Sequence, residues 1–141
     1  FNFIHPPRGD VFVFRTNHIL GIREDPQAGA PYFIKRLTGT PGDELRIDSP
    51  NLYVNGALAE SFGIRRVAAA QAPYRGYGQG QAVLATPAQP FVIPAQSYFA
   101  MGDNSYNSYD SRYWGPVPEE NVVGRGVCVY WPFSRHWGFI R

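Results

Sequence analysis

The stretch "FIKRLTGTPGD", residues 33–43, combines a strand-like pattern, a Gly/Pro turn and the single lysine of the chain, whose other basic residues are twelve arginines. In an extended strand, residues two apart share a face, so Phe33, Lys35 and Leu37 are predicted to lie together. A lysine among large apolar neighbours loses hydration, which lowers its pKa. An uncharged amine near neutral pH could accept a proton from a serine hydroxyl, whereas an arginine stays protonated.

The same lysine also has an ordinary structural interpretation. A strand at the edge of a sheet accommodates a lysine whose aliphatic stem covers apolar surface while its ammonium group stays in water. Residues 33–43 taken alone are consistent with both interpretations. Which one holds depends on the polar groups that the fold brings to Lys35.

Alternating apolar and polar residues predict an all-β (β-rich) fold. Aromatic residues make up 16% of the chain, and 13 prolines and 15 glycines favour short strands joined by turns. The Asn55-Gly56 pair predicts a hairpin. Strands are expected over residues 10–14, 32–37, 44–47, 51–59, 81–86, 91–93, 97–101 and 121–131. The last of these is the longest apolar stretch and is predicted to be a central strand, while the only helical candidate is short, near residues 65–72.

A chain of 141 residues predicts one domain, 1–141. Residues 65–90 differ in composition from the rest of the chain, because they are rich in Ala, Gln, Gly and Pro. This composition predicts a surface excursion or a small inserted subdomain. The sequence contains no run of about 18 apolar residues, which is the length that predicts a membrane span. The net charge of +2 and the scattered basic residues indicate no nucleic-acid partner.

Metal and disulfide chemistry finds little support in the composition. The lone cysteine, Cys128, excludes an internal disulfide and lies in the apolar run "GVCVYW", which favours a buried small hydrophobe. The histidines His5, His18 and His136 have no metal-ligand spacing and lie in no nucleophile motif. The sequence therefore predicts neither a metal nor another cofactor.

A second polar cluster lies in "GDNSYNSYDSR", residues 102–112. If this stretch is extended, Ser108, Asp110 and Arg112 share one side. Asp110 and Arg112 could then form a charge-assisted pair, and the hydroxyl of Ser108 could reach a buried amine. A polar loop with a solvated ion pair explains the same residues equally well.

Four segments together resemble bacterial type I signal peptidases: "RGDVFVF" (8–14), "YFIKRLTGTPGDEL" (32–45), "LYVNG" (52–56) and "YFAMGDNSYNSYDSRYWGPVPEENVVGR" (98–125). The order KR..G.PGD followed by GDN..NS.DSR.WG.VP is specific, and the resemblance covers nearly the whole chain apart from 65–90. It implies a signal-peptidase-like antiparallel β-barrel or sheet domain with long loops. It also implies a membrane-associated serine endopeptidase that uses a Ser/Lys dyad.

The resemblance also implies catalytic and substrate-binding roles for individual residues. Lys35 falls on the general base, and Ser108 falls on the serine that orients its amine. Two supporting ion pairs and three substrate-binding residues are also implied: Asp110 with Arg112, Asp103 with Arg36, and Val13, Phe33 and Ile34. Shallow pockets at the last three would accept small side chains, as in cleavage after an Ala-x-Ala-like pattern, and the strand would offer its backbone edge to the substrate.

The expected activity is removal of N-terminal signal peptides from secreted preproteins, without a cofactor, at the extracytoplasmic (periplasmic) side of the cytoplasmic membrane. In this family the nucleophilic serine lies in a Ser-Met-x-Pro motif upstream of the RGD segment, and no serine of this chain has that context. The serine and the membrane anchor are therefore expected upstream of Phe1, and residues 1–141 alone are expected to be inactive. A non-catalytic family member, or a β-rich binding module that acts as a partner in secretion, is the alternative.

Overall fold

The computed structural model describes residues 5–126, 128–129 and 138–139. The described chain is mostly β, as the alternation predicts, and its strands pair antiparallel. The larger sheet has the order β8-β7-β2-β1-β9, with β1 (Val11–Arg15), β2 (Tyr32–Gly39), β7 (Ser97–Met101), β8 (Val117–Pro118) and β9 (Val122–Arg125). The smaller sheet has the order β5-β4-β3-β6, with β3 (Glu44–Asp48), β4 (Asn51–Val54), β5 (Ala57–Leu58) and β6 (Phe91–Val92).

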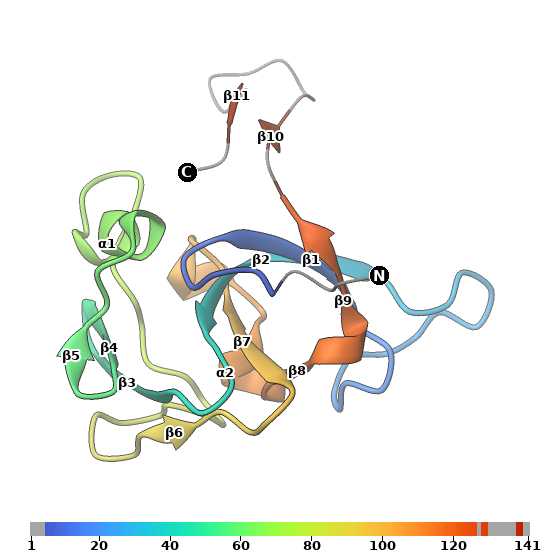
Figure 1. Cartoon of the computed structure of the whole chain (residues 1–141), viewed down its shortest axis with the longest axis horizontal. Coiled ribbons are helices and arrows are strands. Elements are labelled where there is room, and N and C mark those ends of the chain that lie inside the picture. The colour runs from blue at the N-terminus through green and yellow to red at the C-terminus, as the bar shows by residue number, and fades with distance from the viewer. Residues whose placement is uncertain (1–4, 127, 130–137, 140–141) are drawn as a thin grey trace.

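The remaining elements are short. Helix α1 (Phe62–Ala68) lies beside the smaller sheet, and α2 (Ser111–Trp114) follows β7 (Figure 1). Two 3-10 turns cover Ser105–Asn107 and Glu119–Asn121, and β10 (Cys128–Val129) pairs with β11 (Gly138–Phe139). Within the described part of the chain, no helix has the length and apolar character that a membrane span needs.

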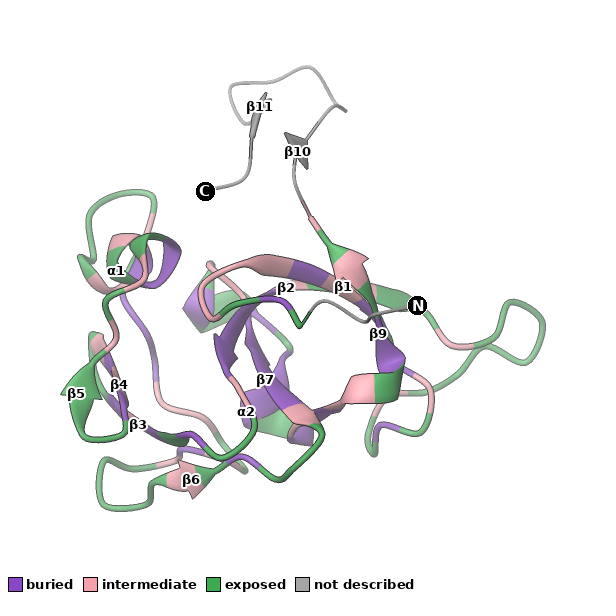
Figure 2. Cartoon of the chain, viewed as in Figure 1, coloured by how far each residue is buried: buried purple, intermediate pink, exposed green. Residues whose placement is uncertain are grey.

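Strand β7 separates two apolar clusters and is buried along most of its length (Figure 2). Phe99 and Met101 pack into a cluster with the smaller sheet and α1. Tyr98 and Ala100 point to the opposite face, into a cluster with β1 and α2. Because side chains alternate along a strand, a strand that is buried on both faces reads as a continuous apolar run. This packing fixes the end of β7, from which the 102–112 loop departs.

Residues 65–90 contain α1 and a long irregular loop. The helix begins at Phe62, before the predicted start at residue 65, and it buries Ile64 and Val67. The loop adds the buried side chains of Tyr77 and Leu84 to the same apolar cluster. The predicted strand 81–86 is wrong.

The physical reason for that error is visible in the backbone hydrogen bonds. The N–H groups of Ala82 and Val83 donate to the carbonyl oxygen of Arg112, at 3.2 and 3.0 Å, in place of a strand partner. Leu84 has a φ of 57°, which a strand cannot include. The apolar residues of this segment therefore bury Leu84 and do not form a strand.

The predicted central strand 121–131 is also wrong in its described part, because β9 is an edge strand that pairs only with β1. Its register shifts beside Gly124, and the named strand ends at Arg125. Residues 127 and 130–131 lie outside the described part of the chain, as does the side chain of Cys128, so its predicted burial stays a prediction. The hairpin prediction is confirmed, because Asn55 and Gly56 turn β4 into β5.

Candidate active site

Strand β2 carries Lys35 to the point where its pairing changes. β2 pairs with β1 from Tyr32 to Arg36, but its pairing with β7 begins only at Arg36. Lys35 therefore lies where β7 ends and the 102–112 loop turns away. The Lys35 Nζ donates a hydrogen bond to Ser108 Oγ at 3.0 Å. The two polar stretches of the sequence meet at this contact.

The surroundings of Lys35 disfavour its charged form. Burial lowers the pKa of Lys35 below its ordinary value of 10.5, and the nearby Arg112 lowers it further, while the carboxylate of Asp110 acts in the opposite direction. The ring centroid of Phe33 lies 5.8 Å from the Nζ. The amine is therefore easier to deprotonate than a lysine in water.

Asp110 and Arg112 form a buried ion pair behind Ser108. Their side chains are 0% and 2% exposed, and the two ends of the guanidinium fork lie 2.9 and 2.7 Å from the two carboxylate oxygens. Arg112 Nη1 donates to the carbonyl oxygen of Gly78 at 2.8 Å and to Ser105 Oγ at 2.7 Å, and Nη2 also donates to the carbonyl oxygen of Ser105 at 2.7 Å. Every charge in this pair is thus compensated without water.

The route by which these residues meet differs from the predicted strand alternation. Asp110 is the N-cap of α2, and one of its oxygens accepts from the backbone N–H of Arg112 at 3.2 Å. The other oxygen accepts from the N–H of Gly102 at 2.9 Å. The prediction of an extended stretch is therefore wrong from Ser111 onward, because a helix begins there, capped by Asp110, whose own backbone is extended. Ser108 keeps an extended backbone.

A second ion pair, between Arg36 and Asp103, holds the turn that follows β7. Its two hydrogen bonds are both 2.7 Å long, and Arg36 also donates to the carbonyl of Gly9 at 2.6 Å. The Arg36 side chain is 2% exposed and packs on α1 at Gly63, where an added Cβ would lie 2.0 Å from Nη1. Arg66 of α1 approaches the same carboxylate, at 3.8 Å. Both predicted pairs are thus present in the structure.

An open cleft of about 360 Å³ surrounds Lys35 and Ser108. It is lined by Val11, Ile34, Lys35, Arg36, Gly102, Asp103, Asn104, Asn107 and Ser108. Of the three residues predicted to bind substrate, only Ile34 is among them. Val13 is the β1 partner of Ile34, and Phe33 contacts Lys35 from the side.

Sequence reasoning missed four lining residues: Val11, Gly102, Asn104 and Asn107. Val11 follows from the pairing register, which places it opposite Arg36, but register is not visible before the strands are paired. Gly102, Asn104 and Asn107 belong to the GDN..NS motif, and membership of this motif could have indicated that they line the cleft.

One edge of β2 is free beside this cleft. No strand of the described chain pairs with Tyr32–Lys35 on the side that faces away from β1. The backbone of Leu37 bonds toward Gly9 and Asp10 on the β1 side, so by alternation the N–H and C=O groups of Ile34 point to the free edge. This edge can accept an extended peptide.

Replacing Gly102 by alanine is expected to lower activity more than stability. An added Cβ would lie 2.2 Å from Ser108 Oγ and 3.6 Å from Lys35 Nζ, so Ser108 must move from the amine. We expect turnover to fall by about 10- to 100-fold, because misplacement of about 1 Å has effects of that size. Gly124→Ala is the matched control, since its added Cβ meets nothing within 4 Å. If the two variants show the same turnover and the same thermal unfolding, the expected importance of the Ser108–Lys35 contact is contradicted.

Among the described residues, no group of three or more His, Cys, Asp or Glu side chains could hold a metal ion. His5 lies 2.8 Å from Glu119 on the β8 side of the larger sheet. His136 lies outside the described residues. The polar side chains that line the cleft are the amine of Lys35, the hydroxyl of Ser108, the amides of Asn104 and Asn107, and the Arg36–Asp103 ion pair.

Comparison with known proteins identifies the family of this chain. The family model for signal peptidase, peptidase S26, matches residues 2–131. The chain is similar to probable signal peptidase I-2 of Synechocystis sp., with 38% identity over 92% of this chain and 50% of that protein. It is also similar to signal peptidase I of Leptolyngbya laminosa, with 35% identity over 96% of this chain and 58% of that protein.

A solved structure extends the similarity to the fold. The crystal structure of a signal peptidase I from Enterococcus faecalis matches with a TM-score of 0.59 and 26% identity, over 86% of this chain and 97% of that one. The chain spans about half the length of the curated relatives it matches. It belongs to the signal peptidase family, peptidase S26.

Proposed function

We propose that residues 1–141 form the catalytic part of a membrane-associated serine endopeptidase that removes signal peptides from secreted preproteins. The observation that carries the proposal is the 3.0 Å contact between the partly buried amine of Lys35 and Ser108. A depressed lysine pKa beside a hydroxyl, in an open cleft, is the arrangement that proton transfer from a nucleophile requires. Membership of the signal peptidase family supports the choice of substrate.

In the proposed mechanism the nucleophilic serine is supplied from upstream of Phe1. Its oxygen attacks the scissile carbonyl while neutral Lys35 takes its proton. The protonated Lys35 gives that proton to the leaving amine, and neutral Lys35 then deprotonates the water that hydrolyses the acyl-enzyme and returns the proton to the departing serine oxygen. These steps exchange protons and an acyl group only, so the proposal includes no cofactor.

Ser108 is assigned a positioning role. Ser108 is only 8% exposed, and its Oγ accepts the hydrogen bond from Lys35 Nζ, so it suits orientation of the amine better than attack on a substrate. The Asp110–Arg112 pair holds the backbone around Ser108, and the Arg36–Asp103 pair holds the turn at the other end of the loop. Together they keep hydroxyl and amine within hydrogen-bond distance.

The preprotein is proposed to bind as an added strand on the free edge of β2. Main-chain hydrogen bonds to Ile34 would align the peptide, and Val13, Phe33 and Ile34 would shape the shallow pockets for small side chains. We also propose that the membrane anchor precedes Phe1 and that this catalytic part lies at the extracytoplasmic side of the cytoplasmic membrane.

The test uses the full-length protein in lipid vesicles with a preprotein that has Ala-x-Ala before its cleavage site. We expect one cut directly after the second alanine, located by mass spectrometry of the new N-terminus. A preprotein with phenylalanine in place of that alanine is the control and should resist, because a shallow pocket excludes the ring. Binding of the preprotein without cleavage would support the non-catalytic alternative instead.

A further inference from the structure

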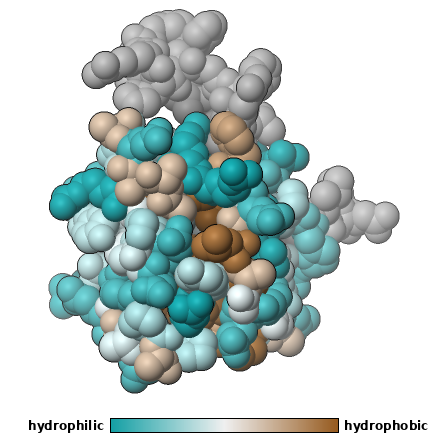
Figure 3. All heavy atoms as spheres, turned by 90° about the vertical axis from the view of Figure 1, so that its left-hand side faces the viewer, coloured by the Kyte–Doolittle hydropathy of each residue, from teal (hydrophilic) through white to brown (hydrophobic). Residues whose placement is uncertain are grey.

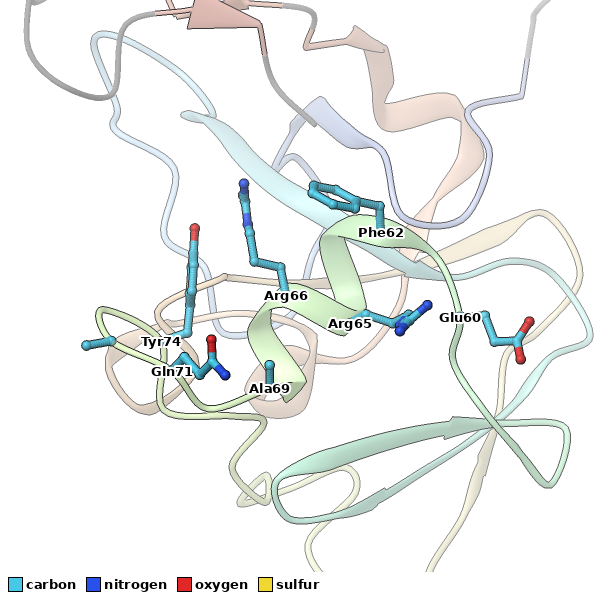
Figure 4. A pocket seen from close by; sticks show the side chains of 8 residues that line it. Glu60, Phe62, Arg65, Arg66, Ala69, Gln71 and Tyr74 are labelled. Atoms are coloured by element: carbon cyan, nitrogen blue, oxygen red, sulfur yellow. The ribbon is translucent and has the colours of Figure 1, made fainter.

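A second pocket, of about 650 Å³, lies against α1 (Figure 4). It is lined by Glu60, Phe62, Arg65, Arg66, Ala69, Gln71, Ala72 and Tyr74. The side of the molecule that carries α1 is mostly hydrophilic, with a small hydrophobic zone between polar side chains (Figure 3). The α1 pocket holds no lysine and no hydroxyl–amine pair, and the proposed mechanism leaves it unused.

Arg66 is the feature of the α1 pocket that points to a ligand. It stands between Phe62 and Tyr74, with its guanidinium carbon 5.9 and 5.2 Å from their ring centroids (Figure 4). Its Nε is buried and has no hydrogen-bond partner, and its ion pair with Asp103 is long, at 3.8 Å. A guanidinium held by two aromatic rings but incompletely paired is ready to bind a carboxylate.

The charge of the α1 pocket favours an acidic ligand. Arg65 and Arg66 contribute two positive charges, and Glu60 contributes one negative charge. Asp103 lies at the edge of the pocket but is bound by both hydrogen bonds from Arg36. An incoming carboxylate would therefore meet a net positive wall with an aromatic surface beside it.

The α1 pocket and the cleft share no lining residue, but they approach each other where Arg66 of the pocket lies 3.8 Å from Asp103 of the cleft. A peptide paired with the free edge of β2 cannot continue past Lys35, because β7 occupies that edge from Arg36 onward. If the residues before the scissile bond lie along Tyr32–Ile34, the residues after it must leave beside Asp103. That exit leads to Arg66.

We propose that the α1 pocket binds the first few residues after the cleavage site and favours acidic side chains there. The pocket thereby adds a preference on the mature side of the preprotein to the requirement for small residues before the cut. The proposal rests on the proposed function, since it needs a peptide in the cleft.

The experiment uses the full-length protein and three preproteins that are identical except at the second to fourth residues after the cleavage site. These residues are all aspartate, all asparagine or all lysine, and kcat/KM is measured for each. We expect the aspartate form to be cleaved about fivefold faster than the lysine form, the size that a partly exposed ion pair gives. The ratio should fall as salt rises to about 0.5 M.

Arg66→Glu should reverse the ratio, and Arg66→Gln should bring it close to one. The aspartate and lysine preproteins are compared within each variant, because Arg66 also touches Asp103 and its replacement could change the overall rate. Arg46→Glu makes the same charge change on β3, where Arg46 pairs with Asp48 and lines neither pocket nor cleft, and it should keep the wild-type ratio. A wild-type ratio of one, or a ratio that Arg66→Gln leaves unchanged, overturns the proposal. Failure to cut the asparagine form after Ala-x-Ala counts against the proposed function.

Discussion

Replacing Lys35 by alanine in the full-length protein is expected to slow preprotein cleavage by about a thousandfold or more, while the fold stays intact. Loss of a general base removes a factor of about 10² to 10⁴, and in the proposed mechanism Lys35 serves both acylation and deacylation. Lys35→Arg should be equally slow, although it keeps the positive charge, because a guanidinium does not release its proton. Single-turnover rates and circular dichroism of the three proteins check this.

The pH dependence follows from the direction of the pKa shift. Burial lowers the pKa of Lys35 from 10.5, so the reactive neutral amine is populated at a lower pH than in a free lysine. The cleavage rate should rise with pH through that lowered value, and the signal of ¹³C-labelled Lys35, assigned by its loss in Lys35→Arg, should titrate in the same range. A rate that rises only near 10.5, or near-normal turnover by Lys35→Arg, would remove Lys35 from the mechanism.

Arg112→Ala is expected to lower the free energy of unfolding by about 3–5 kcal/mol, the effect of leaving one member of a buried ion pair alone. Asp110 is 0% exposed and would lose its counter-ion. The carbonyl oxygens of Gly78 and Ser105 would lose the Arg112 donors as well, and Ser105 Oγ would keep only the N–H of Gly78, at 2.9 Å. Urea unfolding followed by fluorescence measures the change.

Arg46→Ala is the control for that measurement. Its ion pair with Asp48 is 3.6 Å long and its partners are 32% and 57% exposed, so its loss should change stability by less than about 1 kcal/mol. Arg112→Lys should restore little, because an ammonium cannot make the paired contacts of the guanidinium fork. Similar values for Arg112→Ala and Arg46→Ala would show that the buried network contributes little to the fold.

The sequence predicts what depends on local pattern. Alternation around Lys35 and the Asn55-Gly56 pair are enough to predict β2 and the β4–β5 hairpin, because strand period and turn chemistry are short-range properties. The resemblance, and not the spacing, brings Ser108 to Lys35 in the prediction. The distance between them along the chain gives no geometric hint.

What the sequence could not predict depends on contacts between distant segments. The apolar residues 81–86 resemble a strand until Arg112 is seen to accept their N–H groups. The free edge of β2 beside Ile34 arises from where β7 stops pairing, which is a matter of register. The α1 pocket likewise requires that Arg66 and Asp103, far apart in sequence, meet in space.

The loop after α1 also holds the guanidinium of Arg112 in place. Gly78 offers its carbonyl to Arg112, and Gly80 lies so close that an added Cβ would be 2.9 Å from the Cβ of Arg112. A shortened version of this protein without residues 69–90, which lie inside the family match, would thus lose part of the support of Arg112. Engineers who shorten the loop would have to supply a new acceptor for that guanidinium.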